Sequence, residues 1–251
     1  MRILFLDIET APNKVFVWGL WNQNVAINQI EEPGYTLCWA AKWLGEDDIM
    51  FSSIHRDGKE AMLYLVYGLL EEADAVVHFN GTKFDVPKLM QEFLQMGWSP
   101  PTPFAEIDLY RTVKKRFAFP SNKLTYITDQ LGLGSKLAHK GMDLWRECMN
   151  GNDEAWATME AYNKQDVQLL EPFYETLKPW IVGHPNAGLY SDDTNHRCPN
   201  CGSASLQSRG LYHAKTQSYQ RYRCNDCGKW SRTRTSSLDA VKRKAILVGV
   251  E

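Results

Sequence analysis

The chain has 251 residues, of which 44% are hydrophobic and 23% are charged, with a formal net charge of −2. This is an ordinary globular composition, sufficient for one large domain and a small one. The N-terminal apolar run is too short for a signal peptide, and no stretch approaches the roughly 20 apolar residues of a membrane span, so we expect a cytoplasmic protein with reduced thiols and no membrane partner.

The first half of the chain is rich in predicted strands. Residues 2–9 form an apolar run that predicts a buried strand, and residues 75–79 form a second run that predicts a central strand. Between them, aromatic and β-branched residues alternate with polar or glycine breaks and predict antiparallel strands or hairpins at 14–20, 24–30, 35–44 and 48–54.

Helices are predicted from apolar positions spaced three and four residues apart. This spacing predicts helices at 58–73 and about 83–97, and several more helices, after a short strand near 104–109, up to about residue 181. Strands first, followed by alternating strands and helices, indicate an α/β fold with a mixed sheet and flanking helices. Turn-forming residues at 183–195 predict a linker, which divides the chain into domains at 1–182 and 196–251.

Acidic residues interrupt these apolar patterns at three places. Asp7 and Glu9 lie two residues apart at the end of the first strand, so their side chains share one face of it. Two neighbouring carboxylates repel each other unless a cation lies between them. Asp85 follows the strand at 75–79 and a short Asn-Gly loop, near the first turn of the next helix. A carboxylate there interacts well with the helix dipole, which is its alternative, purely structural role.

Asp166 lies on the apolar stripe of a helix predicted from about 153 to 178, four residues after Tyr162. A carboxylate on a buried face must bind a metal ion or accept a hydrogen bond from a buried donor, and the residue pattern alone leaves both roles open. Asp108, at the end of the strand near 104–109, is either a structural hydrogen-bonding residue or a neighbour of the acidic site; we favour the structural role.

Taken in order, Asp7-x-Glu9, Asn80-x4-Asp85 and Tyr162-x3-Asp166 resemble the motifs of the DEDD superfamily of 3′→5′ exonucleases, in its tyrosine-containing subclass. Residues 1–180 are similar to the exonuclease domain of family B DNA polymerases and its stand-alone relatives. The resemblance implies a ribonuclease H-like fold in which the four acids hold two Mg²⁺ or Mn²⁺ ions. It also implies that Tyr162 orients the attacking water, since a phenol with a pKa near 10 is a poor base.

The same resemblance implies hydrolysis of single-stranded DNA from its 3′ end. Substrate contacts are expected from Thr10, Asn80, Phe84 and Lys136. Ribonuclease or structure-specific endonuclease activity remains an alternative, because the same carboxylate cluster serves those reactions and sugar choice depends on contacts near the 2′ position. A non-catalytic nucleic-acid-binding adaptor is the alternative of a different class.

Four cysteines near the C-terminus form two Cys-x2-Cys pairs, Cys198/Cys201 and Cys224/Cys227, separated by 22 residues. This spacing is typical of a tetrahedral zinc site, and the segment resembles a zinc ribbon. Four thiolate ligands leave no open position for water, so the predicted zinc ion is structural. Cys38 and Cys148 are isolated, and we expect them to be buried packing residues.

The predicted ribbon is strongly basic. Residues 196–251 contain 11 Lys/Arg and 3 Asp/Glu, a net charge of +8, whereas the remaining 17 Lys/Arg and 27 Asp/Glu give residues 1–195 a net charge of −10. Aromatic residues alternate with the basic ones, an arrangement suited to nucleic acid, and we expect contacts from Arg221, Arg223 and Arg232. A replication or repair partner bound through the ribbon is a further expectation.

Overall fold

The computed structural model describes residues 1–134 and 141–250, which form two compact units. Arg2–Tyr174 make up the first unit and Glu175–Glu251 the second. The predicted boundaries of the exonuclease domain, linker and ribbon remain predictions.

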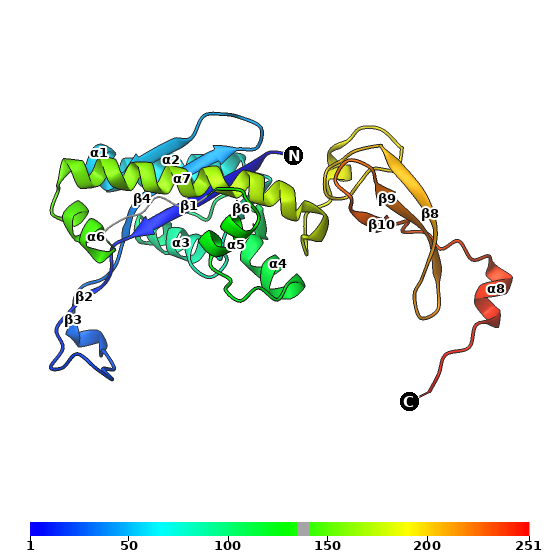
Figure 1. Ribbon diagram of the computed structural model, residues 1–251, viewed down its shortest axis with the longest axis horizontal. Coiled ribbons are helices and arrows are strands. Elements are labelled where there is room, and N and C mark those ends of the chain that lie inside the picture. The colour runs from blue at the N-terminus through cyan, green and yellow to red at the C-terminus, as the bar shows by residue number, and fades with distance from the viewer. Residues whose placement is uncertain (135–140, 251) are drawn as a thin grey trace. The chain divides into compact units, whose positions relative to one another are not determined.

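The first unit is built on a mixed five-stranded sheet, as the sequence predicts (Figure 1). The strand order is β5-β4-β1-β6-β7, with β1 antiparallel to β4 and parallel to β6, and β6 parallel to β7. The strands of this sheet are β1 (Ile3–Thr10), β4 (Thr36–Trp43), β5 (Met50–Ser53), β6 (Ala75–His78) and β7 (Ala105–Asp108).

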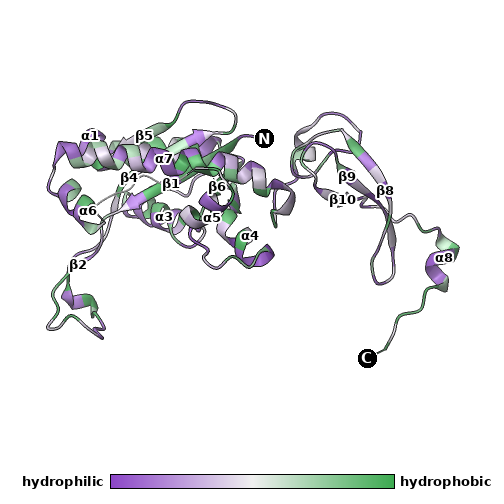
Figure 2. Cartoon of the chain, viewed as in Figure 1, coloured by the Kyte–Doolittle hydropathy of each residue, from purple (hydrophilic) through white to green (hydrophobic). Residues whose placement is uncertain are grey.

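Helices pack on both faces of the sheet. They are α1 (Ile54–Asp57), α2 (Lys59–Glu72), α3 (Asp85–Gln95), α4 (Leu109–Arg116), α5 (Leu124–Gln130), α6 (Met142–Met149) and the long α7 (Asp153–Leu177). Hydrophilic and hydrophobic residues alternate along α7 (Figure 2), as expected of a helix with one buried face.

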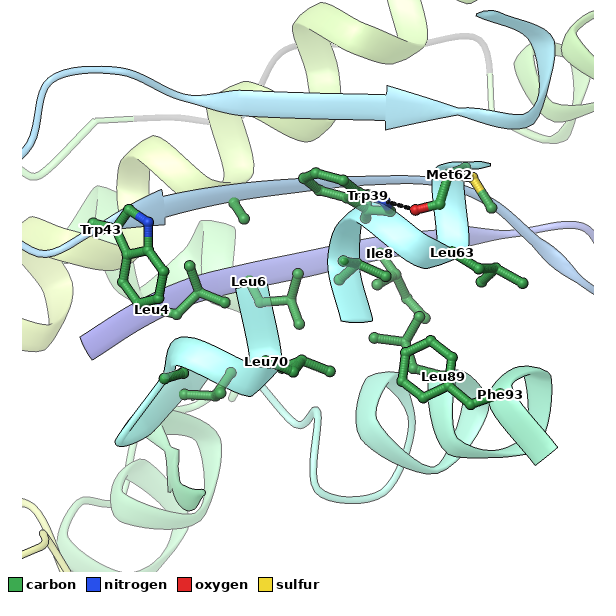
Figure 3. Packing of buried hydrophobic residues seen from close by; sticks show 14 residues of the cluster. Leu4, Leu6, Ile8, Trp39, Trp43, Met62, Leu63, Leu70, Leu89 and Phe93 are labelled. Atoms are coloured by element: carbon green, nitrogen blue, oxygen red, sulfur yellow. Dashed lines mark hydrogen bonds between the residues drawn. The ribbon is translucent and has the colours of Figure 1, made fainter. Parts of the chain in front are cut away.

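The main apolar core lies between the sheet and the helices α2 and α3. Leu4, Leu6 and Ile8 point to this side of β1 and pack with residues of α2 and α3 (Figure 3). Across the core, Trp39 donates its indole N–H to the backbone oxygen of Met62 at 2.8 Å. Because side chains alternate along a strand, the odd-numbered residues of β1 point to the opposite face.

One part of the strand prediction was wrong. Of the strands predicted at 14–20 and 24–30, the structure retains only β2 (Lys14–Val15) and a short 3-10 helix η1 (Ile27–Gln29), followed by β3 (Ile30–Glu32). These residues form an arm that extends from the first unit (Figure 1). Its apolar side chains are exposed, with Phe16 68% and Trp18 101% accessible. Their β-forming composition therefore does not reflect packing into the sheet.

The second unit contains a three-stranded antiparallel sheet of order β10-β9-β8, formed by β8 (Leu206–His213), β9 (Ser218–Cys224) and β10 (Trp230–Arg232). Before it come the 3-10 helices η2 (Lys178–Trp180) and η3 (Ala187–Tyr190), and after it the short α8 (Ala240–Ala245). Among the residues described, no helix is long and apolar enough to span a membrane.

Candidate active site and metal centres

Strand β1 carries the first two acids on the face covered by α7. Phe5, which shares this face, packs edge-on against Tyr174 of α7 at 5.6 Å between ring centroids. Asp7 and Glu9 follow at two-residue intervals and are half-buried. The alternation of side chains along a strand predicted that these carboxylates share one face. The structure shows that α7 packs on this face.

Helix α7 contributes the third acid. Asp166 is 2% exposed, and its carboxylate lies with those of Asp7 and Glu9 in a group in which one oxygen atom from each residue lies within 4.8 Å of the other two. Tyr162 is buried one turn earlier on the same helix, and its ring meets Trp145 edge-on at 6.1 Å.

Asn163 is a residue of this site that the sequence reading missed. It is fully buried on α7, and its side-chain amide donates to Asp7 Oδ2 at 2.8 Å. Its position beside Tyr162 in the third motif was the only available signal, because the contact with β1 arises from tertiary packing. A buried amide that donates to one carboxylate oxygen fixes the direction in which the carboxylate points.

Asp85 reaches the site from the turn between β6 and α3. It lies outside the group of three carboxylates, but its Oδ1 accepts a hydrogen bond from the backbone N–H of Ile8, the residue between Asp7 and Glu9. Burial raises the pKa of Asp85 to about 6; the nearby Asp108 adds to this, whereas His78 and the Ile8 N–H oppose it. A buried carboxyl group with a raised pKa readily exchanges its proton for a cation.

A hydrogen-bonded turn positions Asp85. The ring of buried His78 accepts from the backbone N–H of Gly81 through Nδ1, at 3.0 Å, and its Nε2 lies 3.2 Å from Glu106. Asp108 Oδ1 accepts from the backbone N–H groups of Asn80 and Arg111, at 3.0 and 3.3 Å. Asp108 therefore caps the N-terminus of α4, the structural role that we favoured, and it is also a neighbour of Asp85.

Three of the predicted substrate-contact residues of the first unit, Thr10, Asn80 and Phe84, belong to the described part of the chain and lie next to the elements that carry the acids. Thr10 ends β1 and lines a pocket of about 350 Å³ with Met142 and Trp145. Phe84, 50% exposed, precedes α3, and Asn80 lies in the turn before it. Lys136 lies outside the residues that the structure describes. These assignments remain predictions.

A basic pocket beside the turn between β6 and α3 was not predicted from the sequence. It measures about 300 Å³ and includes Asn80 and Asp108; its basic lining residues are Lys83, Arg111, Lys114 and Lys115. All four are exposed, in a part of the chain that is acidic overall. The run Lys114-Lys115-Arg116 was visible in the sequence, but nothing in it indicated that it would lie near Asp85.

The chemistry of the acidic cluster fits divalent metal ions. Carboxylates as close as those of Asp7, Glu9 and Asp166 repel one another, and burial increases this cost unless a cation neutralises them. Oxygen donors are the ligands that Mg²⁺ and Mn²⁺ prefer. The three carboxylates, with Asp85 beside them, therefore form a donor set suited to such ions.

The four cysteines of the second unit form a separate cluster, as predicted. Their sulfur atoms lie within 4.8 Å of one another, with Sγ–Sγ distances of 3.5 Å for Cys198–Cys227 and 3.6 Å for Cys201–Cys224. Tetrahedral zinc with Zn–S bonds of about 2.3 Å separates its sulfur ligands by about 3.8 Å, so the cluster fits zinc closely. Cys38 and Cys148 are buried in the first unit, as expected.

Glycines complete both cysteine turns. Gly202 and Gly228 have φ angles of 73° and 76°, a left-handed conformation that glycine adopts without steric cost. Their N–H groups donate to the backbone oxygens of Cys198 and Cys224, at 2.9 and 3.1 Å. The sequence therefore specifies the local turn geometry as well as the ligands.

Comparison with known proteins agrees with this fold. The family model described as the RNase_H superfamily matches residues 4–178. The family B DNA polymerase from the hyperthermophilic archaeon Pyrobaculum calidifontis is similar in structure, with a TM-score of 0.55 and 16% sequence identity. The similarity covers 71% of this chain and 24% of the polymerase chain, so this chain spans about a quarter of that protein. No curated protein matches the sequence. The match of the family model over most of the first unit shows that the chain belongs to the RNase H superfamily of nucleases.

Proposed function

We propose that this protein is a metal-dependent 3′→5′ exonuclease that hydrolyses phosphodiester bonds at the 3′ end of single-stranded DNA. The observation that carries the proposal is the convergence of Asp7 and Glu9 of β1 with Asp166 of α7, which brings one carboxylate oxygen of each residue within 4.8 Å of the others. The 3′ polarity is supported by the resemblance of the three motifs to DEDD exonucleases. The choice of DNA is supported by the similarity of residues 1–180 to the exonuclease domain of family B DNA polymerases, and RNA is the alternative substrate.

Asp7, Glu9, Asp85 and Asp166 would hold two Mg²⁺ or Mn²⁺ ions. Such ions, when bound, lower the pKa of an attacking water and stabilise the leaving 3′-oxygen and the charge that develops on phosphorus. Asn163 holds the Asp7 carboxylate in place through its 2.8 Å hydrogen bond. Tyr162, one turn before Asp166, would orient the attacking water, while the basic pocket of Lys83, Arg111, Lys114 and Lys115 offers contacts to phosphates of the strand.

The experiment that tests this function uses 5′-labelled single-stranded DNA with Mg²⁺ or Mn²⁺. We expect a ladder that shortens from the 3′ end, and its loss both with chelator and in Asp7→Asn. Asp47→Asn, which removes an exposed carboxylate in the turn between β4 and β5, is the matched control and should retain activity.

Substrate variants separate the proposed reaction from its alternatives. Blocking the 3′ end should stop the reaction, and circular DNA should remain intact. Cleavage of circular DNA would show that the protein is an endonuclease rather than an exonuclease. Preferential shortening of labelled RNA would show that the substrate is RNA rather than DNA. If none of these polymers is cleaved in the presence of metal ions, the proposed activity is refuted.

A further inference from the structure

We propose that one face of the three-stranded sheet β10-β9-β8 is a binding surface for single-stranded nucleic acid. The face is defined by Tyr212, Tyr219, Arg221, Arg223, Trp230 and Arg232 and is called the arginine–aromatic face below. The proposal concerns the second unit alone and does not depend on catalysis by the acidic cluster.

The strand register places these side chains on one face. Along β9, Tyr219, Arg221 and Arg223 are two residues apart and therefore point to the same side. Directly opposite them, Tyr212 of β8 pairs with Tyr219, and two residues of β10, Arg232 and Trp230, pair with Arg221 and Arg223. Residues that face each other across antiparallel strands project to the same side of the sheet.

Contacts between the side chains confirm this arrangement. The guanidinium of Arg221 lies 5.0 Å from the ring centre of Trp230, and that of Arg232 lies 3.9 Å from the ring centre of Tyr219. Both are diagonal neighbours across the β9–β10 pair, within the range of cation–π attraction. Arginines and aromatic rings therefore form one continuous layer.

The arginine–aromatic face is open to solvent. Trp230 is 51% exposed and Tyr212 is 45% exposed, so neither forms the small core of the ribbon. The opposite face is covered in part, because the ring of His196 lies 5.4 Å from that of Tyr222. Tyr222 thus points away from the arginine–aromatic face.

The positive charge of the arginine–aromatic face favours a polyanion as its ligand. None of the residues in β8, β9 and β10, all of which the structure describes, is acidic. Within the described part of the chain, no ion pair involves any of the three arginines on the face, Arg221, Arg223 and Arg232. Their positive charge is therefore available to phosphate groups.

The exposed rings favour a single strand over a duplex. Unpaired bases stack on aromatic side chains whatever their sequence, whereas the bases of a duplex are already stacked on each other. Rings such as Trp230 and Tyr212, interleaved with arginines, offer stacking and phosphate contacts together along one strand. DNA and RNA share this chemistry, so the test includes both.

The test measures binding by fluorescence anisotropy with the full, zinc-loaded chain and 5′-fluorescein-labelled dT20, rU20 and a DNA duplex. No Mg²⁺ or Mn²⁺ is added, and gels verify that the strands stay intact. Trp230→Ala and Tyr212→Ala should each weaken binding of a single strand about fivefold or more. Arg223→Gln should weaken it and reduce the slope of log affinity against log salt by about 0.7.

Two variants control for unspecific effects. Lys215→Gln removes a positive charge from the turn between β8 and β9, and Leu211→Ala shortens an exposed side chain of β8 that points to the opposite face. Both should bind within about twofold of the parent chain. Zinc content and melting temperature show that each variant remains folded.

The proposal is overturned if Trp230→Ala and Tyr212→Ala, with zinc retained, bind as the parent does, if Lys215→Gln weakens binding as much as Arg223→Gln, or if the duplex binds as tightly as the single strand. Because binding is measured without turnover, the outcome is separate from that of the proposed function. A chain that binds through this face but never shortens a strand would support the inference and refute the exonuclease.

Discussion

At the scale of single residues, a buried acid that is proposed to bind metal also destabilises the metal-free fold. Asp85 is 4% exposed, and burial is the main reason for its pKa of about 6. Because this pKa lies above the ordinary value, folding favours the protonated form. The metal-free fold therefore loses stability as the pH rises from about 4 through 6, where Asp85 ionises, and bound cations offset the loss.

Because ionised Asp85 destabilises the metal-free fold but is proposed to bind metal, we expect Asp85→Asn to raise stability and to lower activity. At pH 7–8, the metal-free variant should be more stable than the parent by about 2–3 kcal/mol, since one pKa unit corresponds to about 1.4 kcal/mol. The gain should disappear below about pH 4, where Asp85 is protonated in both states. Urea unfolding across this pH range measures the difference, and nuclease assays should show lost activity. A variant less stable than the parent at pH 8 would contradict this account.

Asn163 is predicted to act through Asp7 rather than on the substrate. Asn163→Ala removes the donor at 2.8 Å from Asp7 Oδ2, which should weaken Mn²⁺ binding and activity about 10–100-fold. Calorimetric titration with Mn²⁺ measures the binding directly. Asn150→Ala, at an exposed position between α6 and α7, is the matched control. Unchanged Mn²⁺ affinity in a folded Asn163→Ala chain would rule out this positioning role.

At the scale of elements, the sequence predicted what depends on local periodicity. The two-residue spacing placed Asp7 and Glu9 on one face of β1, and the helical spacing placed Tyr162 and Asp166 on one face of α7. The strands predicted at 14–20 and 24–30 failed because β-forming residues such as Trp18 are exposed on an arm. Contacts between elements, such as Asn163 with Asp7, were out of reach because periodicity carries no information about which elements meet.

The turn between β6 and α3 is an element that tolerates no added side chain. A Cβ atom at Gly81 would lie 2.5 Å from the His78 ring and 2.9 Å from Asp85 Oδ2. His78 is buried and hydrogen-bonded, so the ring cannot move aside freely. Gly81→Ala should therefore destabilise the fold by about 1–3 kcal/mol and lower metal-dependent activity. Thermal unfolding measures the first effect, with Gly68→Ala, where a Cβ meets no atom within 4 Å, as the control.

At the scale of the whole molecule, the fold of each unit is stabilised by a different interaction. The first has a broad apolar core between its sheet and helices. In the second, few of the described residues after η2 are buried, namely Ile181, Cys198, Asn200, Ser218 and Cys224. So small a core contributes little folding free energy, whereas a structural zinc ion contributes on the order of 10 kcal/mol. The fold of the second unit should therefore depend on metal while that of the first does not.

Cys224→Ser tests this difference between the units. The variant should lose its zinc, and limited proteolysis with mass spectrometry should locate new cleavage sites between residues 196 and 250, while the first unit retains its cooperative thermal transition. Cys227→His offers zinc an alternative fourth ligand and should retain both metal and protection. Burial raises the pKa of Cys201 to about 11 in the metal-free chain, so zinc must displace protons, and acidification should release the metal. A ribbon that resists protease after losing zinc would show that its apolar contacts suffice, and the proposed role of the metal would then be wrong.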